Sequence, residues 1–181
     1  ADFDLPQLDI LLHKKIPMGA GLGGGSSDAA FMMRILNEEY QLGMNNSEMK
    51  KRVSKLGADC AFFIDPHPAY ATGIGDIFSP ITLSLKKWVL VLVKPQTSVS
   101  TQEAYSQIVP QKTSVDLREA LALPVEEWKN VVCNDFEKSV FSTHPEIEAI
   151  KETLYDMGAC FALMSGSGST VFALFRNKQG D

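Results

Sequence analysis

Apolar side chains recur every three or four residues in a stretch that follows a run of glycines. A stripe with this spacing predicts an amphipathic helix that packs one face on a core. Its members are Ala29, Met32, Met33, Leu36 and Tyr40. Ser26 and Ser27 stand just ahead of the stripe, where residues that cap a helix N-terminus belong. We therefore expect the helix to begin at these two serines.

The rest of the chain alternates between strand-like and helix-like segments. Strands are predicted at residues 8–13, as a pair around Gly73 and Gly75 within 69–81, and at 88–93, 161–164 and 170–175. Helices are predicted near residues 47–55, 101–109, 116–123 and 145–157. Gly57 ends the first of these helices and leaves Asp59 at the head of an apolar run. This alternation indicates a mixed α/β architecture, with the best domain boundary at residues 80–87.

Composition and charge argue against several classes of partner. The chain has 181 residues, of which 45% are hydrophobic and 22% charged, as in a globular protein with a real core. A formal net charge of −5 and the lack of a Lys/Arg run argue against nucleic acid and membrane surfaces as partners. No apolar stretch is long enough to cross a bilayer, and the first residues lack the features of a signal peptide. We expect a cytoplasmic protein that is a monomer or a homodimer.

The cysteines and histidines do not suggest a metal site. Cys60, Cys133 and Cys160 are odd in number and far apart, which fits neither a disulfide framework nor a zinc site and favours a reducing compartment. The histidines, at positions 13, 67 and 144, are equally scattered and have no Cys or carboxylate at ligand spacing. We predict no structural metal.

The glycine run between Pro17 and Ser27 carries the clearest chemical signal in the chain. Glycines permit positive φ angles and leave no side chain between backbone N–H groups and a ligand. The helix that follows adds unpaired N–H donors and the positive end of its dipole, so the run can wrap a phosphate chain. Ser26 can offer a hydroxyl to phosphate or to a phosphate-bound Mg²⁺, as can Ser27, unless both are only helix caps.

Two better-known phosphate loops compete with this interpretation. The P-loop G-x-x-x-x-G-K-[ST] fails because Gly25 is followed by Ser26 and not by Lys. The dinucleotide motif G-x-G-x-x-G is matched by residues 19–24, with Glu38 and Glu39 as candidates for its acidic residue. These glutamates continue the helical stripe, whereas a dinucleotide fold needs the acidic residue at the end of a second strand. A glycine loop with a purely structural role is a further alternative. It is hard to explain without a ligand, because so many glycines lose backbone entropy on folding without a gain in packing. A serine hydrolase has little support, since no G-x-S-x-G elbow is present.

Four segments carry a pattern longer than any single glycine motif. They are P-M-G-A-G-L-G-G-G-S-S-D-A-A at residues 17–30, L-G-A-D-C-A-F-F at 56–63, A-T-G-I-G-D-I-F-S-P at 71–80 and M-S-G-S-G-S-T-V-F-A-L-F at 164–175. Together they resemble the motifs of the GHMP kinases, the superfamily of galactokinase, homoserine kinase, mevalonate kinase and phosphomevalonate kinase. The triple glycine and the second and third segments look most like the members that phosphorylate a cytidine diphosphate derivative of methylerythritol in non-mevalonate isoprenoid synthesis.

This resemblance implies an α+β fold of two domains, the GHMP kinase fold. Residues 1–86 would form part of an N-terminal domain like ribosomal protein S5 domain 2, and residues 87–181 a ferredoxin-like C-terminal domain. The family's first motif, which carries a catalytic Lys, has no match here, and the chain opens without Met. We therefore expect the chain to begin in mid-protein, without the first strands of its N-terminal domain, and to be inactive by itself.

The resemblance also assigns roles to individual residues. Asp59 matches the catalytic aspartate, although an Asp after a helix end is by itself more often a turn or capping residue. Thr101 and Tyr105 match a Thr and a stacking aromatic for the cytidine end of the substrate, although a helix aromatic can equally join a core. Lys14 matches a position beside the nucleotide base. The ATP loop covers Pro17, Met18, Gly19, Ala20, Gly21, Leu22, Gly23, Gly24, Gly25, Ser26 and Ser27.

The implied reaction transfers a phosphoryl group from ATP, with Mg²⁺ bound to the nucleotide, to the 2-hydroxyl of the methylerythritol portion. Two departures from the family pattern affect local geometry: Asp28 stands where some relatives have Asn, and Cys60-Ala61 replaces a small hydrophobe and Pro. The alternatives are a GHMP kinase of the homoserine or mevalonate type, a nucleotide-binding module without activity, and a dinucleotide-binding protein.

Overall fold

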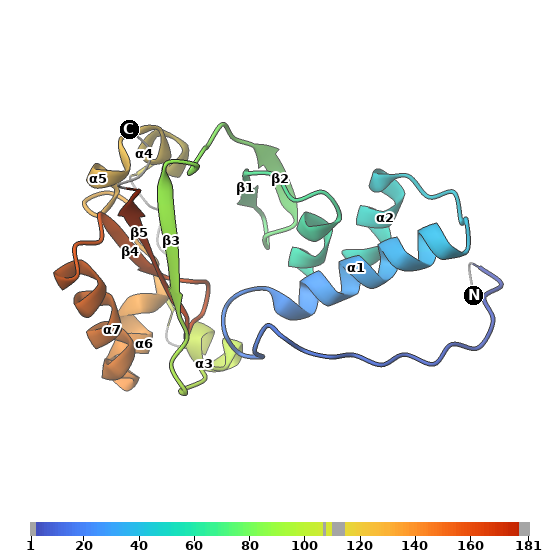
Figure 1. The fold of residues 1–181 in the computed structure, drawn as a ribbon, viewed down its shortest axis with the longest axis horizontal. Helices are drawn as coiled ribbons and strands as arrows, with labels where there is room; N and C mark the ends of the chain where they lie inside the picture. Colours follow the sequence, from blue (N-terminus) through green and yellow to red (C-terminus); the bar gives the residue numbers. More distant parts are fainter. Residues whose placement is uncertain (1–2, 107, 110–114, 178–181) are drawn as a thin grey trace. The chain divides into compact units, whose positions relative to one another are not determined.

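The structure is a computed structural model that describes residues 3–106, 108–109 and 115–177 (Figure 1). The chain divides into two compact units. The first unit combines Ala1–Met18 with Gly23–Ile81, and the second combines Gly19–Leu22 with Thr82–Asp181. The glycine run is therefore divided, because its middle four residues belong to the second unit.

The first unit consists of helices and a two-stranded hairpin. Its elements are α1 (Gly24–Glu39), α2 (Asn46–Val53), the 3₁₀ helix η1 (Ala58–Ile64), β1 (Ala69–Thr72) and β2 (Ile77–Pro80). The two strands pair antiparallel, which confirms the hairpin predicted around Gly73 and Gly75. The three helices contact one another and bury a small apolar core. Its buried members are Ala30, Met44, Met49, Val53, Cys60, Ala61 and Ile64.

Helix α1 begins earlier than the sequence predicted. Its N-cap is Gly23, which has a left-handed backbone with φ 64°, and no side chain caps the helix. The backbone N–H of Ser27 donates to the Gly23 carbonyl oxygen at 2.9 Å, so this serine already lies within the first turn. The prediction that Ser26 and Ser27 cap the helix is wrong, because glycine adopts the left-handed turn at no steric cost and the helix follows at once.

Helix α2 confirms the helix predicted at residues 47–55, with an earlier end at Val53. It begins with a capping box. The Asn45 side-chain oxygen accepts from the backbone N–H of Glu48 at 3.0 Å, and the Glu48 carboxylate accepts from the backbone N–H of Asn45 at 2.9 Å. Two backbone donors that a helix N-terminus leaves unpaired are thereby satisfied.

The segment before the glycine run has no regular structure. Residues 4–15 form neither helix nor strand, so the strand predicted at 8–13 is wrong. Leu11 is 97% exposed, and Ile10 and Leu12 are also exposed. An apolar pattern becomes a strand only where a neighbouring strand satisfies its backbone groups. Among the described residues, no strand pairs with this segment.

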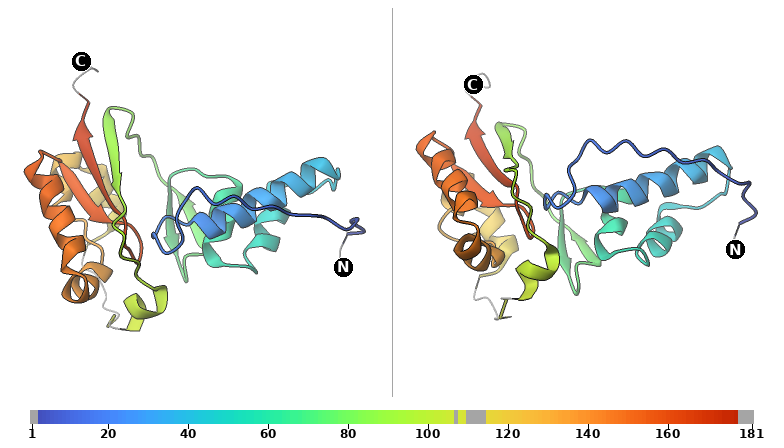
Figure 2. Two further views of the ribbon diagram at one scale, coloured as in Figure 1. Left: turned by 60° about the horizontal axis from the view of Figure 1, so that its bottom comes forward. Right: turned by 90° about the horizontal axis from the view of Figure 1, so that it is seen from below.

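The second unit is a three-stranded antiparallel sheet flanked by helices. The strands are β3 (Trp88–Val93), β4 (Phe161–Met164) and β5 (Val171–Arg176), in the order β3-β5-β4. The helices are α3 (Thr101–Ser106), α4 (Leu117–Ala122), α5 (Val125–Trp128), α6 (Phe136–Thr143) and α7 (Pro145–Asp156). Helices α6 and α7 lie along one face of the sheet (Figure 2).

The central strand β5 is buried on both faces. Val171 and Ala173 pack in the core shared with α6 and α7, whereas Leu174 packs in a second core with Val125 and Trp128 of α5. Side chains of a strand alternate between its two faces, so burial on both sides requires apolar residues in succession. This is why V-F-A-L-F reads as a continuous apolar run.

Most predicted elements of the second unit are confirmed. β3 and β4 have the predicted bounds, β5 begins one residue late, and α4 and α7 lie within their predicted ranges. α3 ends at Ser106, and residue 107 of its predicted range lies outside the described residues. The sequence did not predict α5 and α6, which are short. The predicted α+β architecture is confirmed. In the part of the chain that the structure describes, no helix has the length and apolar character to span a membrane.

Candidate active site

The start of α1 presents backbone donors. The first N–H groups of a helix have no partner within it and carry the positive end of the helix dipole. The position of Gly23, which precedes them, favours glycine, because a Cβ there would lie 2.8 Å from the Phe63 ring and the φ angle is 64°. The start of α1, with Gly23 before it, therefore offers a backbone cradle that can bind an anion such as a phosphate.

The middle of the glycine run is held by the second glycine loop, Ser165–Ser169. The Ser165 hydroxyl donates to the Gly21 carbonyl oxygen at 2.8 Å, and the backbone N–H of Thr170 donates to the Ala20 carbonyl oxygen at 3.2 Å. The two loop segments approach so closely that a Cβ on Gly21 would lie 2.1 Å from the Ser165 carbonyl oxygen. Gly21 is therefore required by this contact as well as by its φ of 70°.

Asn134 holds the second glycine loop, and the sequence analysis missed it. Its side-chain amide donates to the carbonyl oxygens of Met164 and Gly166, each at 2.8 Å. Its side-chain oxygen accepts from the backbone N–H of Phe136 at 3.0 Å. In the sequence, Asn134 stands just ahead of a helix, a position that indicates a helix cap. It gives no sign of hydrogen bonds to a loop 30 residues away.

Lys14 lies beside the start of α1. Its ammonium group pairs with the carboxylate of Asp28, and a Cβ on Gly24 would lie 3.5 Å from its Nζ atom. Both side chains of the pair are partly exposed, at 26% and 35%. The ammonium group thus lies next to the start of α1, with its charge balanced by the Asp28 carboxylate.

Asp59 lies exposed in the first turn of η1. Across the described residues, no hydrogen bond or ion pair engages its carboxylate. Gly75, in the turn between β1 and β2, approaches it, since a Cβ on Gly75 would lie 3.5 Å from Oδ1. An exposed carboxylate without a partner can accept a proton or a hydrogen bond from a ligand hydroxyl.

Thr101 and Tyr105 both lie exposed on α3. Tyr105 is 61% exposed, and its ring makes an edge contact with Phe136, with 4.8 Å between ring centroids. It therefore lies on the surface and is not part of the core. A surface aromatic ring can stack on a base.

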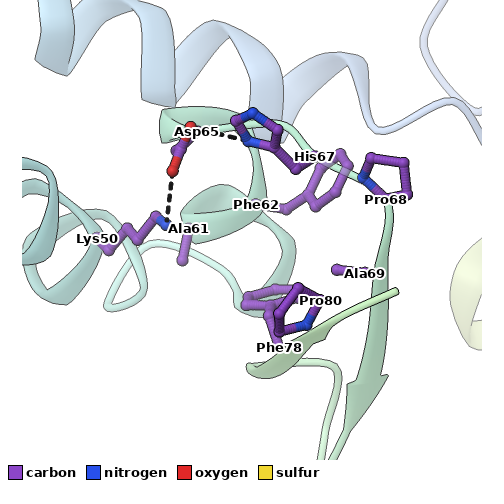
Figure 3. A pocket seen from close by; sticks show the side chains of 9 residues that line it. All are labelled: Lys50, Ala61, Phe62, Asp65, His67, Pro68, Ala69, Phe78 and Pro80. Carbon is purple, nitrogen blue, oxygen red and sulfur yellow. Dashed lines mark ion pairs between the residues drawn. The ribbon is translucent and has the colours of Figure 1, made fainter. Parts of the chain in front are cut away.

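Each of the two units contains a cavity. In the first unit, a cavity of about 270 Å³ is lined by Lys50, Ala61, Phe62, Asp65, His67, Pro68, Ala69, Phe78 and Pro80 (Figure 3). Its polar side is an ion-pair cluster in which Asp65 contacts His67 at 3.0 Å and Lys50 at 3.6 Å. In the second unit, a cavity of about 450 Å³ is mostly apolar and reaches Asn134, Ser165 and Gly166. The described residues contain no group of three or more His, Cys, Asp or Glu side chains that could hold a metal ion.

The chain matches both halves of one protein family. The family description "GHMP kinases N terminal domain" matches residues 1–66, and "GHMP kinases C terminal" matches residues 116–180.

Curated relatives extend this similarity over nearly the whole chain. The chain is 56% identical over 174 residues to a 4-diphosphocytidyl-2-C-methyl-D-erythritol kinase of Bacteroides fragilis, and 53% identical over 173 residues to the kinase of the same name from Parabacteroides distasonis. Each match covers 96% of this chain and 64% of the relative. The chain thus spans less than two thirds of the length of these relatives.

The fold of this chain is similar to those of solved structures. A crystal structure of 4-(cytidine 5'-diphospho)-2C-methyl-D-erythritol kinase matches with a TM-score of 0.76 at 32% identity, over 89% of this chain and 59% of that one. A homoserine kinase from Cytophaga hutchinsonii matches with a TM-score of 0.70 at 17% identity, over 92% of this chain and 59% of that one. The second likeness concerns the fold alone.

Proposed function

Because the chain belongs to the GHMP kinase family, we propose that the whole protein transfers the γ-phosphoryl group of ATP to the 2-hydroxyl of 4-diphosphocytidyl-2-C-methyl-D-erythritol. The observation that carries the proposal is the backbone cradle at the start of α1, which follows the left-handed Gly23. The curated relatives named for this kinase support the choice of substrate. The protein would act in non-mevalonate isoprenoid synthesis in the cytoplasm.

The proposed roles follow from the chemistry of each group. Backbone N–H groups of residues 21–26 bind the phosphates of ATP, Ser27 offers its hydroxyl, and Lys14 packs against the base. Mg²⁺, bound with the nucleotide, offsets the phosphate charge. Thr101 and Tyr105 bind the cytidine end. Residues 1–86 act as the ATP-binding domain and residues 87–181 as the C-terminal domain.

In the proposed reaction, the substrate oxygen forms a bond to the γ-phosphorus while the bond to the bridging oxygen of ADP breaks. The hydroxyl proton leaves toward Asp59, which orients the hydroxyl or accepts its proton. The products are ADP and the 2-phosphate of the substrate. Positioning and charge stabilisation supply most of the catalysis in such transfers.

The proposal is tested with Asp59→Asn in the full-length protein, by measuring ADP release with the cytidylylated substrate. We expect kcat to fall by about 10²-fold or more, the usual effect of losing a general acid or base. Asp76→Asn is the matched control, because Asp76 is an exposed carboxylate of the same unit whose Oδ1 accepts from the backbone N–H of Ile74, a contact that Asn retains. Near-normal turnover in Asp59→Asn would remove Asp59 from the catalytic role.

The choice of acceptor and nucleotide needs separate measurements. A panel of cytidylylated substrate, homoserine and mevalonate distinguishes the members of the family, and only the first should give ADP above background. Titration with ATP and with NAD distinguishes a kinase from a dinucleotide-binding protein. NAD binding without ATP binding would contradict the proposal.

A further inference from the structure

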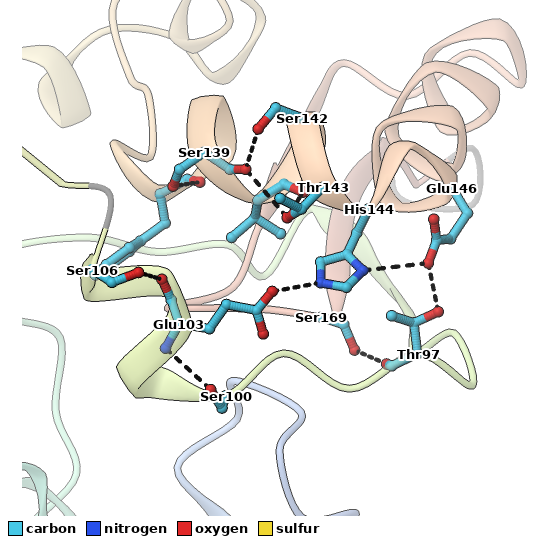
Figure 4. A network of polar contacts seen from close by, with 12 residues as sticks. Thr97, Ser100, Glu103, Ser106, Ser139, Ser142, Thr143, His144, Glu146 and Ser169 are labelled. Carbon is cyan, nitrogen blue, oxygen red and sulfur yellow. Dashed lines mark hydrogen bonds and ion pairs between the residues drawn. The ribbon is translucent and has the colours of Figure 1, made fainter.

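His144 lies at the junction of α6 and α7, with a side chain that is 22% exposed. Two backbone hydrogen bonds hold its main chain independently of the ring. Its N–H donates to the Val140 carbonyl oxygen at 2.7 Å, and its carbonyl oxygen accepts from the Ile147 N–H at 3.0 Å. The ring atom Nε2 lies 3.0 Å from Oε1 of Glu103, on α3 (Figure 4). An ionised carboxylate can only accept, so Nε2 must carry the hydrogen of this bond.

The other side of the ring faces a second carboxylate. Nδ1 lies 3.8 Å from Oε1 of Glu146, and that oxygen accepts from the Thr97 hydroxyl at 2.6 Å. This hydroxyl holds the pKa of Glu146 below its usual range, with a smaller contribution from His144. The carbonyl oxygen of Thr97 accepts in turn from the hydroxyl of Ser169, in the second glycine loop. The polar contacts therefore run continuously from α3 to that loop (Figure 4).

Helix α3 depends on such contacts for its position. It has six residues, too few for a helix to be stable without tertiary contacts. One side chain, Ala104, enters the core, and the Ser100 hydroxyl caps the helix by accepting from the backbone N–H of Glu103 at 3.0 Å. Thr101 is exposed, and Tyr105 adds one edge contact with Phe136 of α6. The bond between His144 and Glu103 ties α3 to the junction of α6 and α7.

We propose that His144 is a positioning residue for the nucleoside end of the substrate, because it fixes α3 through Glu103 and so sets the placement of Thr101 and Tyr105. This inference rests on the proposed function. His144 does not touch the substrate in this proposal, and its removal should weaken cytidine binding while the phosphoryl transfer step is unchanged.

The test is steady-state kinetics of His144→Ala in the full-length protein. We expect KM for the cytidylylated substrate to rise about tenfold, the change that corresponds to losing one hydrogen bond to a charged group. The kcat value and KM for ATP should stay within about twofold, because the bound state reacts as before. His144→Gln should recover most of the loss, since its amide nitrogen can donate to Glu103 much as Nε2 does.

Two further variants separate the contact from a general loss of folding. His67→Ala removes the other partly paired histidine, in the first unit, and should leave all three kinetic constants unchanged. Glu103→Ala combined with His144→Ala should raise KM no more than the stronger single variant, because both remove the same contact. Additive effects would contradict a shared contact.

Hydrogen exchange supplies a readout that does not depend on activity. In His144→Ala, the amides of residues 101–106 should exchange faster, whereas those of β3 and β5 should not change. If the wild type phosphorylates the substrate and His144→Ala has an unchanged KM, the positioning role is overturned and the proposed function stands. If the wild type does not phosphorylate it, the proposed function fails and the role in substrate binding falls with it, while exchange still reports whether His144 holds α3.

Discussion

Gly21 and Gly25 belong to the same glycine run, but their surroundings differ. Gly21 lies against the Ser165 carbonyl oxygen at a positive φ, whereas a Cβ on Gly25 would have no neighbour within 4 Å. We predict that Gly21→Ala destabilises the protein by about 2–4 kcal/mol, from overpacking and a strained backbone. Gly25 lies inside α1, so Gly25→Ala should instead stabilise it by about 0.5–1 kcal/mol.

Urea unfolding of both variants measures this difference. Equal effects at the two positions would show that the contact between Gly21 and the second glycine loop does not form in solution.

Asn134 carries a second prediction at the scale of residues. Asn134→Asp places an oxygen where the amide now donates to the Met164 and Gly166 carbonyl oxygens, and should cost about 1–3 kcal/mol of stability. Asn130→Asp is the control, because Asn130 is exposed in the same unit. The free energy of unfolding from urea titration compares the two. A loss no larger than in the control would contradict the clamp.

Sequence reasoning can propose a site residue only where its chemistry is local. Glycines before a helix predicted a phosphate cradle from backbone geometry alone, without reference to the rest of the fold. Asn134 and His144 act on partners 30 and 41 residues away, and nothing in their neighbouring residues indicates those partners. Such contacts become visible only when the fold brings the segments together.

At the scale of elements, the cap of α2 gives a simple prediction. Asn45→Ala removes the side-chain acceptor for the N–H of Glu48 and should cost about 1 kcal/mol. Asn45→Ser keeps an acceptor and should cost less. Thermal unfolding, with exchange of the α2 amides as a local readout, measures both variants. Equal losses for Ala and Ser would mean that the cap contributes nothing.

The start of α4 gives a prediction about pH. Hydrogen bonds from the Arg118 side chain and backbone hold the pKa of Asp116 below its usual range. A lowered carboxyl pKa stabilises the fold above the unfolded value, about 3.9, and this contribution is lost as the pH falls through the lowered pKa. An NMR titration should show the Asp116 pKa moving up in Arg118→Gln. An unchanged pKa would exclude the side chain as its main cause.

Helices and strands were predicted correctly where the apolar pattern of the segment matches its burial in the fold. The strand at 88–93 and the helix at 145–157 have strong apolar patterns and clear ends at Lys94-Pro95 and Gly158. The segment at 8–13 has a comparable pattern but lacks a paired strand among the described residues. Helix α5 spans only four residues, too short for a periodic stripe to stand out. Helix α6, F-E-K-S-V-F-S-T, consists largely of Ser, Thr, Val and Phe, which have low helix propensity.

For the whole molecule, the proposed function predicts stabilisation by ligand. ATP with Mg²⁺, at a free concentration a hundredfold above Kd, should add about 2.7 kcal/mol to the stability of the folded state. Thermal unfolding should therefore shift upward with ATP and Mg²⁺, and chelation of the metal by EDTA should reduce the shift. The same shift with NAD, or none with ATP, would count against the proposed nucleotide.

The sequence did not predict that one unit contains two separate segments of the chain. A domain boundary near residues 80–87 assumes that each unit is one continuous stretch of chain. The second unit also takes in Gly19–Leu22, because hydrogen bonds from Ser165 and Thr170 hold these residues. Nothing in the composition of the glycine run indicates that its middle and its ends belong to different units.

The contact between Gly21 and Ser165 joins positions 144 residues apart, which has a consequence for the order of events during synthesis. A ribosome delivers the N-terminal partner first, and the chain between the two must be made before they can meet. Closing so long a loop costs chain entropy, and contacts between distant positions therefore form more slowly than a helix. The glycine run should therefore reach its final shape among the last steps of folding, well after α1 can form. A nascent chain stalled before Ser165 would present the helix without the finished loop.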